Sequence, residues 1–326
     1  MEKIQILADQ HPTGSVQSVA ELLKGLLEPT YAVTICNRLK DLHSSYATIV
    51  LQPRDYAPVS ELGRFVGLGK VVYLYSAHPA GTAPHKLAPQ LLCGPTTATY
   101  VFPTPYVQTV LTAMARKILA PARIRNASLR SSVIPYCIDP RFKPRNANDP
   151  SVFLAPFNRV DRTFKGFNEH LDFTTKFGLI CKKPSFHDFR HGDADYAHLD
   201  ELPEGHPYVL THQGTREDYI EHAQSAGFFF CAASKESFGL MYLELLNSGC
   251  IGIFLDKPWV HSLLPGYPYV TTSVNSAIEM ALHMRDNYQE TVVRFVEWQR
   301  EKDYAKMYSA TTVQASWLKL LAEPIT

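Results

Sequence analysis

The stretch Gly227-Phe-Phe-Phe-Cys-Ala-Ala-Ser-Lys-Glu-Ser-Phe-Gly-Leu-Met-Tyr-Leu-Glu-Leu-Leu-Asn-Ser-Gly249 joins two apolar segments through a short polar turn. Residues 227–232 contain consecutive phenylalanines and no charge, which predicts a buried parallel strand. The second apolar segment predicts a helix, with residues 237–240 in its first turn. Two glutamates, Glu236 and Glu244, lie eight residues apart across this turn. A strand, a turn and a helix in this order are typical of an α/β sheet.

The start of this helix suits a phosphorylated or polyhydroxylated ligand. The first amides of a helix have no intrahelical partner, and the helix dipole adds partial positive charge there. Gly239 would let a ligand approach the backbone closely. The carboxylates of Glu236 and Glu244 only accept hydrogen bonds, so they match the paired hydroxyls of a sugar or a ribose. The alternative is structural: one acid stabilised at a helix start, and a second on the solvated helix face.

Strand and helix patterns alternate along the chain, as in an open α/β fold. Short strands are predicted at residues 4–8, 47–51, 71–75, 132–136, 151–155, 178–181, 208–211, 227–232 and 252–255. Helices are predicted at 16–27 and 107–119, followed by a helical tail at 287–322. We expect one domain at 1–145, a second at 146–290, and C-terminal helices at 291–326 that pack back across both. Ligands bind beyond the carboxyl ends of strands in such sheets, so two facing sheets would place a ligand between the domains.

Composition narrows the class of protein. The 326 residues are 45% hydrophobic, which is enough for two ordinary cores. No apolar stretch approaches the ~20 residues that a membrane span requires, and the first residues predict a strand rather than a signal peptide. The cysteines are scattered, which predicts reduced core residues of a cytoplasmic protein. They are Cys36, Cys93, Cys137, Cys181, Cys231 and Cys250.

Charge is distributed unevenly between the two halves. Residues 1–150 hold 16 Lys and Arg against 9 Asp and Glu, whereas residues 151–326 hold 16 against 22. Much of the basic excess comes from eight side chains: Arg116, Lys117, Arg123, Arg125, Arg130, Arg141, Lys143 and Arg145. This excess indicates an anionic partner for the first half, or simply a solvated face.

Four segments, taken in order, resemble a known family. They are Asp9-Gln-His-Pro-Thr-Gly-Ser15, Val133-Ile-Pro-Tyr-Cys-Ile-Asp-Pro-Arg-Phe-Lys-Pro144, Leu154-Ala-Pro-Phe-Asn-Arg-Val-Asp-Arg-Thr-Phe-Lys-Gly166 and the segment 234–249. The set is similar to the GT-B glycosyltransferases of the large retaining superfamily that includes glycogen synthase and bacterial mannosyltransferases. The resemblance implies an α/β GT-B fold of two facing, doubly wound parallel-sheet domains with a C-terminal helical tail. It also implies a hexosyl- or pentosyltransferase that uses a nucleoside-diphosphate sugar, a UDP-sugar above all, and neither a metal nor another cofactor.

The resemblance also assigns roles to individual residues. Arg159 and Lys165 would neutralise the donor diphosphate, with Arg162 competing for the role of Arg159. Glu236 would accept hydrogen bonds from the donor sugar and Glu244 from the ribose. The remaining donor contacts would come from Gly14, Ser15, His78 and Ser234, and from the backbone amides of Phe238, Gly239 and Leu240. For His78, a structural role is the alternative.

The acceptor is left open by the sequence. The basic residues Arg116, Lys117, Arg123, Arg125 and Arg130 suit a polyanion such as DNA carrying a hydroxymethylated base, the substrate of virus-encoded enzymes that act in the host cytoplasm. A base acceptor would leave the stack and contact aromatic side chains, for which Tyr100, Phe102 and Tyr106 are candidates. An anionic membrane glycolipid or a cell-wall glycan fits equally well. Two other classes remain, a sugar-nucleotide epimerase and a non-catalytic sugar-nucleotide-binding protein.

A polar cluster offers a weaker alternative site. It comprises His187, His191, Asp193, Asp195 and His198. The spacing of His187 and His191 would allow a metal on a helix. Gly192 and the surrounding charge favour a solvated loop instead, so we expect no metal site here.

Overall fold

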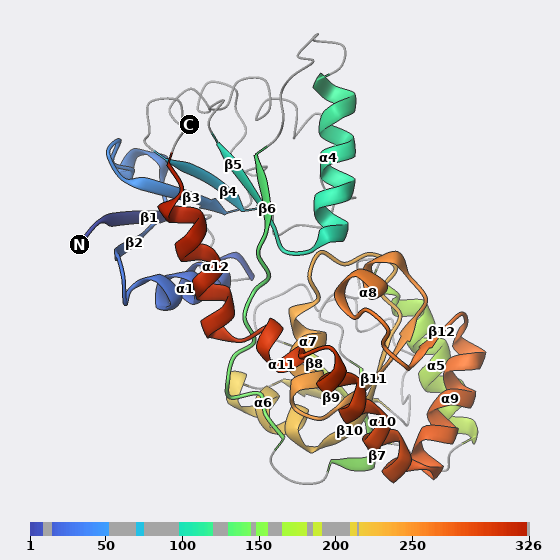
Figure 1. Ribbon diagram of the computed structural model, residues 1–326. Helices are drawn as coiled ribbons and strands as arrows, with labels where there is room; N and C mark the ends of the chain where they lie inside the picture. Colours follow the sequence, from blue (N-terminus) through green and yellow to red (C-terminus); the bar gives the residue numbers. More distant parts are fainter. Residues whose placement is uncertain are drawn as a thin grey trace. The chain divides into compact units, whose positions relative to one another are not determined.

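The computed structural model describes ten ranges of the chain, which fall into two compact units (Figure 1). The ranges are 1–8, 15–51, 70–74, 98–119, 130–144, 148–155, 165–180, 185–190, 209–213 and 215–324. The first unit comprises Met1–Cys137 and Ala310–Thr326, and the second comprises Ile138–Ser309. The sequence placed the boundary after residue 145 and kept the tail together. The structure instead divides the C-terminal helices between the two units.

In its described part, the first unit is built on a six-stranded sheet of order β2-β1-β3-β4-β5-β6. Every neighbouring pair in this order is parallel. The elements are β1 (Lys3–Leu7), α1 (Ser15–Leu27), β2 (Ala32–Cys36), a 3-10 turn η1 (Leu39–Asp41), β3 (Ala47–Leu51), β4 (Val71–Leu74), β5 (Thr99–Phe102), α4 (Pro105–Leu119), β6 (Ser131–Val133) and α12 (Ala310–Ala322).

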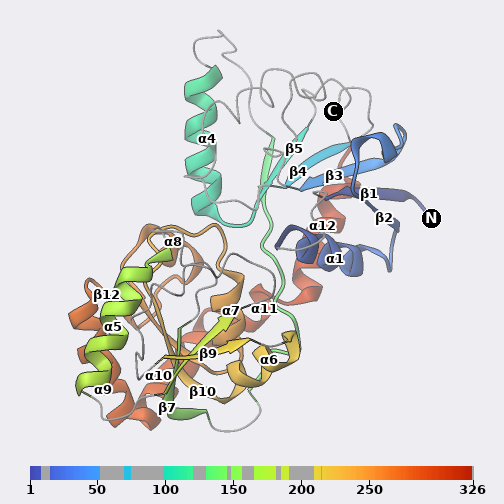
Figure 2. The same cartoon turned by 180° about the vertical axis from the view of Figure 1, so that it is seen from behind.

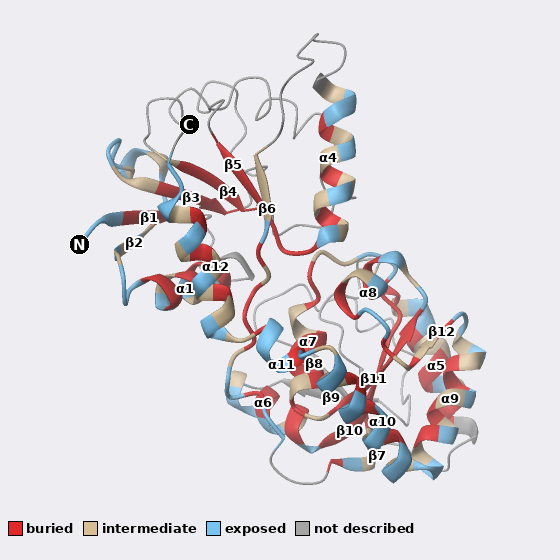
Figure 3. Cartoon of the chain, in the orientation of Figure 1, coloured by how far each residue is buried: buried red, intermediate tan, exposed pale blue. Residues whose placement is uncertain are grey.

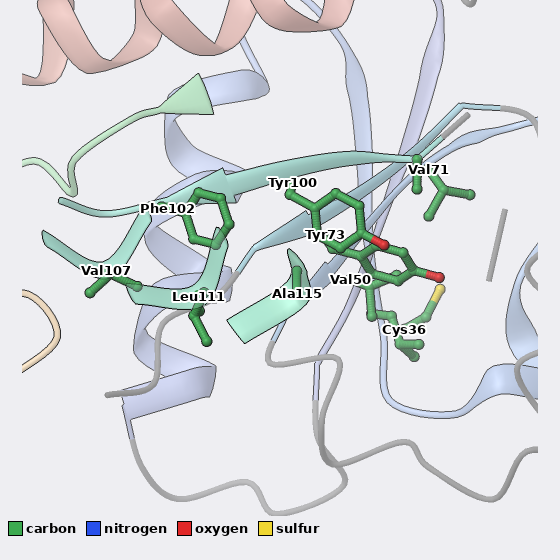
Figure 4. Packing of buried hydrophobic residues seen from close by; sticks show 11 residues of the cluster. Cys36, Val50, Val71, Tyr73, Tyr100, Phe102, Val107, Leu111 and Ala115 are labelled. Carbon is green, nitrogen blue, oxygen red and sulfur yellow. The ribbon is translucent and has the colours of Figure 1, made fainter. Parts of the chain in front are cut away.

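One core of this unit lies between its sheet and α4 (Figure 4). Val107, Leu111 and Ala115 repeat every four residues along α4, and each is buried against the strands. Tyr100 and Phe102 belong to the same core, with only 6% and 2% of their surface exposed. The expectation that they would stack on a nucleic-acid base is therefore wrong: alternate β5 side chains fill the core instead. Tyr106, the third candidate, is partly buried against this cluster.

The C-terminal helix α12 is held at two places by other parts of the first unit. It lies beside α1 in both views, and Gln314 Nε2 donates to the Leu26 carbonyl at 2.7 Å (Figures 1 and 2). Lys70, which precedes β4, donates through Nζ to three carbonyls at the C-terminal end of α12. They belong to Leu320 at 2.5 Å, Leu321 at 2.9 Å and Glu323 at 2.6 Å. A lysine placed here satisfies carbonyls that have no partner within the helix.

The second unit, as far as it is described, contains another six-stranded parallel sheet, of order β12-β11-β10-β7-β8-β9. Its strands are β7 (Asp149–Ala155), β8 (Ser185–Arg190), β9 (Val209–Gln213), β10 (Ala226–Cys231), β11 (Ile251–Leu255) and β12 (Val270–Thr271). Its helices are α5 (Phe167–Ile180), α6 (Arg216–Ser225), α7 (Leu240–Asn247), α8 (Pro258–Leu263), α9 (Val274–Asp286), α10 (Tyr288–Glu301) and α11 (Tyr304–Met307). Helices α5 and α9 lie side by side in both views (Figure 2).

The phenylalanines of β10 explain why helices cover both faces of this sheet. Side chains alternate between faces along a strand. Phe230 stacks on Phe173 of α5 at 4.3 Å between ring centroids. Phe229 points to the opposite face, where it stacks on Tyr242 of α7 at 6.0 Å. The neighbouring strands β10 and β11 are buried along their whole length and appear red in Figure 3. The predicted strand at 227–232 is thus a central strand buried on both faces.

Two sequence expectations are wrong in this unit. Residues 178–180, predicted to begin a strand, form the last turn of α5. His170, Phe173 and Phe177 are all buried at helical spacing, and this longer pattern prevails over the short apolar run. The neighbouring strand is β8, which includes His187 instead of leaving it in a loop. His191, Asp193, Asp195 and His198 lie outside the described residues.

The described cysteines lie in the cores, as their apolar surroundings in the sequence predict. The described thiols Cys36, Cys137, Cys231 and Cys250 are free and buried. Burial raises the pKa of the Cys231 thiol to about 12, so this group is neutral at ordinary pH. Among the described helices, none is both long and apolar enough to cross a membrane.

Candidate functional site

The candidate site begins at the turn between β10 and α7. Gly239 is the N-cap of α7 and has a left-handed backbone, with φ 67° and ψ 41°. A Cβ on this residue would lie 2.9 Å from Tyr242 Cδ2 and 3.3 Å from Glu236 Cγ. The turn therefore requires glycine. The helix itself begins at Leu240, so most of the residues predicted for its first turn, 237–240, belong to the preceding loop.

Lys165 and Glu236 form an ion pair beside this turn. Lys165 Nζ lies 2.5 Å from Glu236 Oε2, and the two side chains are 16% and 13% exposed. The other carboxylate oxygen, Oε1, accepts a hydrogen bond from the Ser237 amide at 3.0 Å. Water screens such a sheltered pair less than it screens a surface pair. The structure thus brings together, in one ion pair, two residues that the sequence assigned to the same ligand.

Gly166 holds the backbone next to Lys165 in place. Its φ is +76°, and a Cβ there would lie 2.5 Å from the Ala232 carbonyl oxygen and 2.7 Å from the Ala232 Cβ. Only glycine allows the backbone at position 166 to lie this close to Ala232, the residue that follows β10. Because β7 and β10 are neighbours in the sheet, this packing brings Lys165, which follows β7, to Glu236, which follows β10.

Glu244 is the second glutamate, and it is buried on α7 with 3% of its surface exposed. Arg216 Nη2 lies 2.5 Å from Glu244 Oε1, and Arg216 Nη1 lies 3.4 Å from Glu244 Oε2. Burial raises the pKa of the Glu244 carboxyl, and the charge and hydrogen bonds of Arg216 oppose that rise. The guanidinium therefore favours the ionised form of the carboxyl, whereas burial favours its neutral form.

Arg216 is held from several sides. It is the first residue of α6, whose N-cap Thr215 forms a reciprocal capping box with Asp218. The guanidinium carbon lies 4.8 Å from the centre of the Phe142 ring and 5.4 Å from that of Tyr219. These contacts fix where the planar cation lies before it meets a carboxylate.

A chain of alternating charges connects this pair to the surface. The Asp139 carboxylate lies 3.9 Å from Arg216 and 2.6 Å from Arg141. Burial tends to raise the pKa of Asp139, but the hydrogen bonds and charge of Arg141 outweigh it and hold that pKa below its ordinary value. Arg141 also pairs with Glu217 at 3.1 Å. Arg141 is thus engaged with acids of the second unit and is not part of a basic surface on the first.

Sequence reasoning did not assign Arg216 to the site. A signal was nevertheless present: Thr215 is followed three residues later by Asp218, a pattern typical of a helix start. This start comes directly after a predicted strand, where ligand-contacting residues collect in parallel sheets. Its pairing with Glu244 joins side chains of two different helices, and no spacing within one element could reveal it.

The remaining predicted donor residues differ in their surroundings. Ser234 is exposed, whereas Phe238 is buried against Tyr308 with ring centres 5.8 Å apart. Leu240 is the partly buried first residue of α7. Ser15 is the first residue of α1. Four further candidates lie outside the described residues: Gly14, His78, Arg159 and Arg162.

The predicted basic residues of the first unit are described only in part. Arg116 and Lys117 are exposed in the last turn of α4, where positive charge also suits the helix dipole. Arg130 donates to the Pro324 carbonyl at 3.4 Å. Arg123 and Arg125 lie outside the described residues.

Comparison with known proteins finds similar solved structures but no similar sequence. No protein-family model and no curated protein matches the chain. HepE of Anabaena, solved with UDP and glucose, matches with a TM-score of 0.69 and 14% identity over 99% of this chain and 100% of HepE. WaaG, a glycosyltransferase involved in lipopolysaccharide biosynthesis, matches with a TM-score of 0.67 and 12% identity over 99% of this chain and 100% of WaaG.

A longer protein, TarM, matches with a TM-score of 0.63 and 12% identity over 87% of this chain. The present chain spans 56% of the length of TarM. At sequence identities this low, the similarity to these structures is one of fold. It is consistent with the two parallel sheets and the helical C-terminal tail described above. The chain has the GT-B fold.

Proposed function

We propose that this chain is a retaining glycosyltransferase that moves a sugar from a UDP-sugar to an acceptor hydroxyl. The observation that carries the proposal is the Lys165–Glu236 pair at the start of α7, with Glu244 further along the same helix. This arrangement offers a cation for a diphosphate and acceptor oxygens for hydroxyls. HepE and a TarM variant were both solved with UDP, which supports the choice of nucleotide.

The proposed reaction depends on an exchange of partners at Lys165. The donor diphosphate replaces Glu236 as the partner of Lys165, and Glu236 then accepts hydrogen bonds from the donor sugar. The lysine stabilises the charge that develops on the departing diphosphate. Arg159 or Arg162 supplies a second cation, His78 contacts the sugar, and Gly14 and Ser15 approach the diphosphate. No step is assigned to a metal or to another cofactor.

Transfer with retention is proposed to take place on one face of the sugar, without a protein nucleophile. The contacts of the two glutamates support this choice. The Ser237 amide holds one oxygen of Glu236, which suits a carboxylate that accepts hydrogen bonds from the sugar. Glu244 is buried against Arg216 and suits a binding role.

For the acceptor we propose a saccharide hydroxyl on a glycan or a glycolipid. WaaG takes part in lipopolysaccharide biosynthesis, and a TarM variant was solved with α-GlcNAc-glycerol. Hydroxymethylated DNA is the second candidate, resting on the exposed Arg116 and Lys117. It is the weaker of the two, because Tyr100 and Phe102 are buried and cannot stack on an extruded base.

The test is a transfer assay with a panel of nucleoside-diphosphate sugars. UDP release without acceptor identifies the donor; saccharide, glycolipid and hydroxymethylated DNA acceptors are then compared at low and high salt. The proposal expects UDP release that a saccharide or glycolipid accelerates, and a product whose anomeric configuration, read by NMR, matches that of the donor. Conversion of the donor sugar without UDP release would indicate an epimerase, and binding without turnover would indicate a binding protein. Acceleration by DNA alone would select the second acceptor.

A further inference from the structure

We propose that Arg216 is a positioning residue that keeps the Glu244 carboxylate charged and in one orientation for the ribose of the donor nucleotide. The inference rests on the proposed function, because it takes the ribose as the ligand of Glu244. Arg216 itself is not required to touch the donor.

The pair leaves part of the hydrogen-bonding capacity of the carboxylate unused. Arg216 directs one N–H group at each oxygen of Glu244, at 2.5 and 3.4 Å. A carboxylate offers about four acceptor positions in all, of which Arg216 uses two and the Tyr219 hydroxyl uses a third. The remaining acceptor position matches a ribose hydroxyl, which donates a hydrogen bond. The planar fork also fixes the rotation of the carboxylate, which a lysine ammonium would leave free.

The charges around Glu244 show why the arginine is needed. Glu244 faces Arg216 and Tyr219 of α6, Asp139 of the segment 134–144 and Tyr304 of α11. Of these described groups, only Arg216 is positively charged. Burial and the charge of Asp139 both raise the pKa of Glu244. Without the guanidinium the carboxyl would be protonated at a higher pH, and a protonated acid is a poorer acceptor for hydroxyls.

The experiment compares two ligands that differ only at the ribose. Isothermal titration would measure binding of UDP and of 2′,3′-dideoxy-UDP to the full chain at several pH values from 6 to 8. The variants are Arg216→Lys, which keeps the charge but loses the fork, and Arg216→Gln, which loses both. Arg294→Gln is the matched control, because Arg294 also lies over a tyrosine ring, that of Tyr269 at 5.8 Å, and is exposed in the same unit. Circular dichroism would check that each variant is folded.

The wild type and Arg294→Gln are expected to bind UDP at least tenfold more tightly than dideoxy-UDP. Both Arg216 variants are expected to lose most of that preference, while their affinity for dideoxy-UDP changes little. In Arg216→Gln, UDP binding should also weaken more steeply on acidification than it does in the wild type. If Arg216→Lys and Arg216→Gln both keep the wild-type preference for UDP over dideoxy-UDP, Arg216 does not position Glu244. The proposed function would still stand in that case. A wild type that does not bind UDP would instead remove the proposed function, and this role with it.

Discussion

Replacing Gly166 with alanine is expected to destabilise the second unit more than the same change at Gly266. The two glycines have nearly the same left-handed backbone, with φ of +76° and +72°. Their surroundings differ. A Cβ at position 166 would lie 2.5 Å from the Ala232 carbonyl oxygen, whereas at position 266 the nearest atom is the Lys302 Cε, at 3.3 Å. The first contact is backbone, and the second is the mobile end of a side chain.

The magnitudes follow from these contacts. The left-handed backbone costs an alanine about 1–2 kcal/mol at either position. At Gly166 the clash forces a backbone shift, and overpacking of this kind costs about 1–3 kcal/mol more. The free energy of unfolding should therefore fall by about 2–5 kcal/mol for Gly166→Ala and by about 1–2 kcal/mol for Gly266→Ala. Because Gly166 adjoins Lys165, only the first variant should also weaken UDP binding.

The assay is urea unfolding followed by tryptophan fluorescence, together with UDP titration of the folded proteins. Trp259 and Trp298 are buried in the second unit and report on it, while Trp317 in the first unit gives a signal common to all variants. Equal losses of stability in Gly166→Ala and Gly266→Ala would refute this expectation. They would mean that the backbone at Ala232 can move away from the new Cβ without any loss of folding free energy. UDP binding unaltered by Gly166→Ala would show that this turn does not position Lys165.

Three further expectations concern His170, Lys70 and Asp139, none of which is proposed to contact the donor. Burial lowers the pKa of His170 to about 3 from an ordinary 6.5. Between pH 6.5 and pH 3, His170 is therefore protonated in the unfolded chain but neutral in the folded one. The free energy of unfolding should fall as the pH is lowered through this range, by at most about 1.4 kcal/mol per pH unit. Unfolding at stepped pH should show a shallower slope for His170→Gln; an identical slope would contradict this. Lys70→Met removes the bonds to the end of α12 and should cost about 1–3 kcal/mol, seen as faster amide exchange in α12. Unchanged exchange would mean that Lys70 does not hold that helix. Asp139 has a lowered pKa, so Asp139→Asn should be less stable than the wild type at pH 7, and the difference should disappear as the pH falls below 3.8. A difference that persists in acid would point to lost packing instead.

Features carried by a continuous stretch of chain were predictable from the sequence. The strand at 227–232 has an uninterrupted apolar run, and a polar turn separates it from the next apolar segment. The structure has β10 and α7 at these places. The run at 178–181 was misread because a few apolar residues fit a strand and the end of a helix equally well. The pattern that distinguishes them begins at His170, well before the run.

Features that depend on contacts between elements were not predictable in the same way. Lys165 and Glu236 were expected to serve one ligand, but their direct pairing follows from the close approach of Gly166 to Ala232. Arg216 lies 28 residues from Glu244 in the sequence, and their pairing needs α6 and α7 to be packed. The aromatic residues of β5 were misassigned for a related reason, since the sequence does not say which of them the core will bury.

The most direct test of the central claim is UDP release from a UDP-sugar donor by the wild type and by Glu236→Gln. Glutamine keeps the size of the side chain and removes its charge, so Lys165 loses its resting partner while the diphosphate can still bind. Glu236→Gln is expected to bind UDP at least as tightly as the wild type and to release UDP from the donor about a hundredfold more slowly. UDP release by Glu236→Gln at the wild-type rate would contradict the proposed role of Glu236. A wild type that neither binds UDP nor releases it from any donor would contradict the proposed function as a whole.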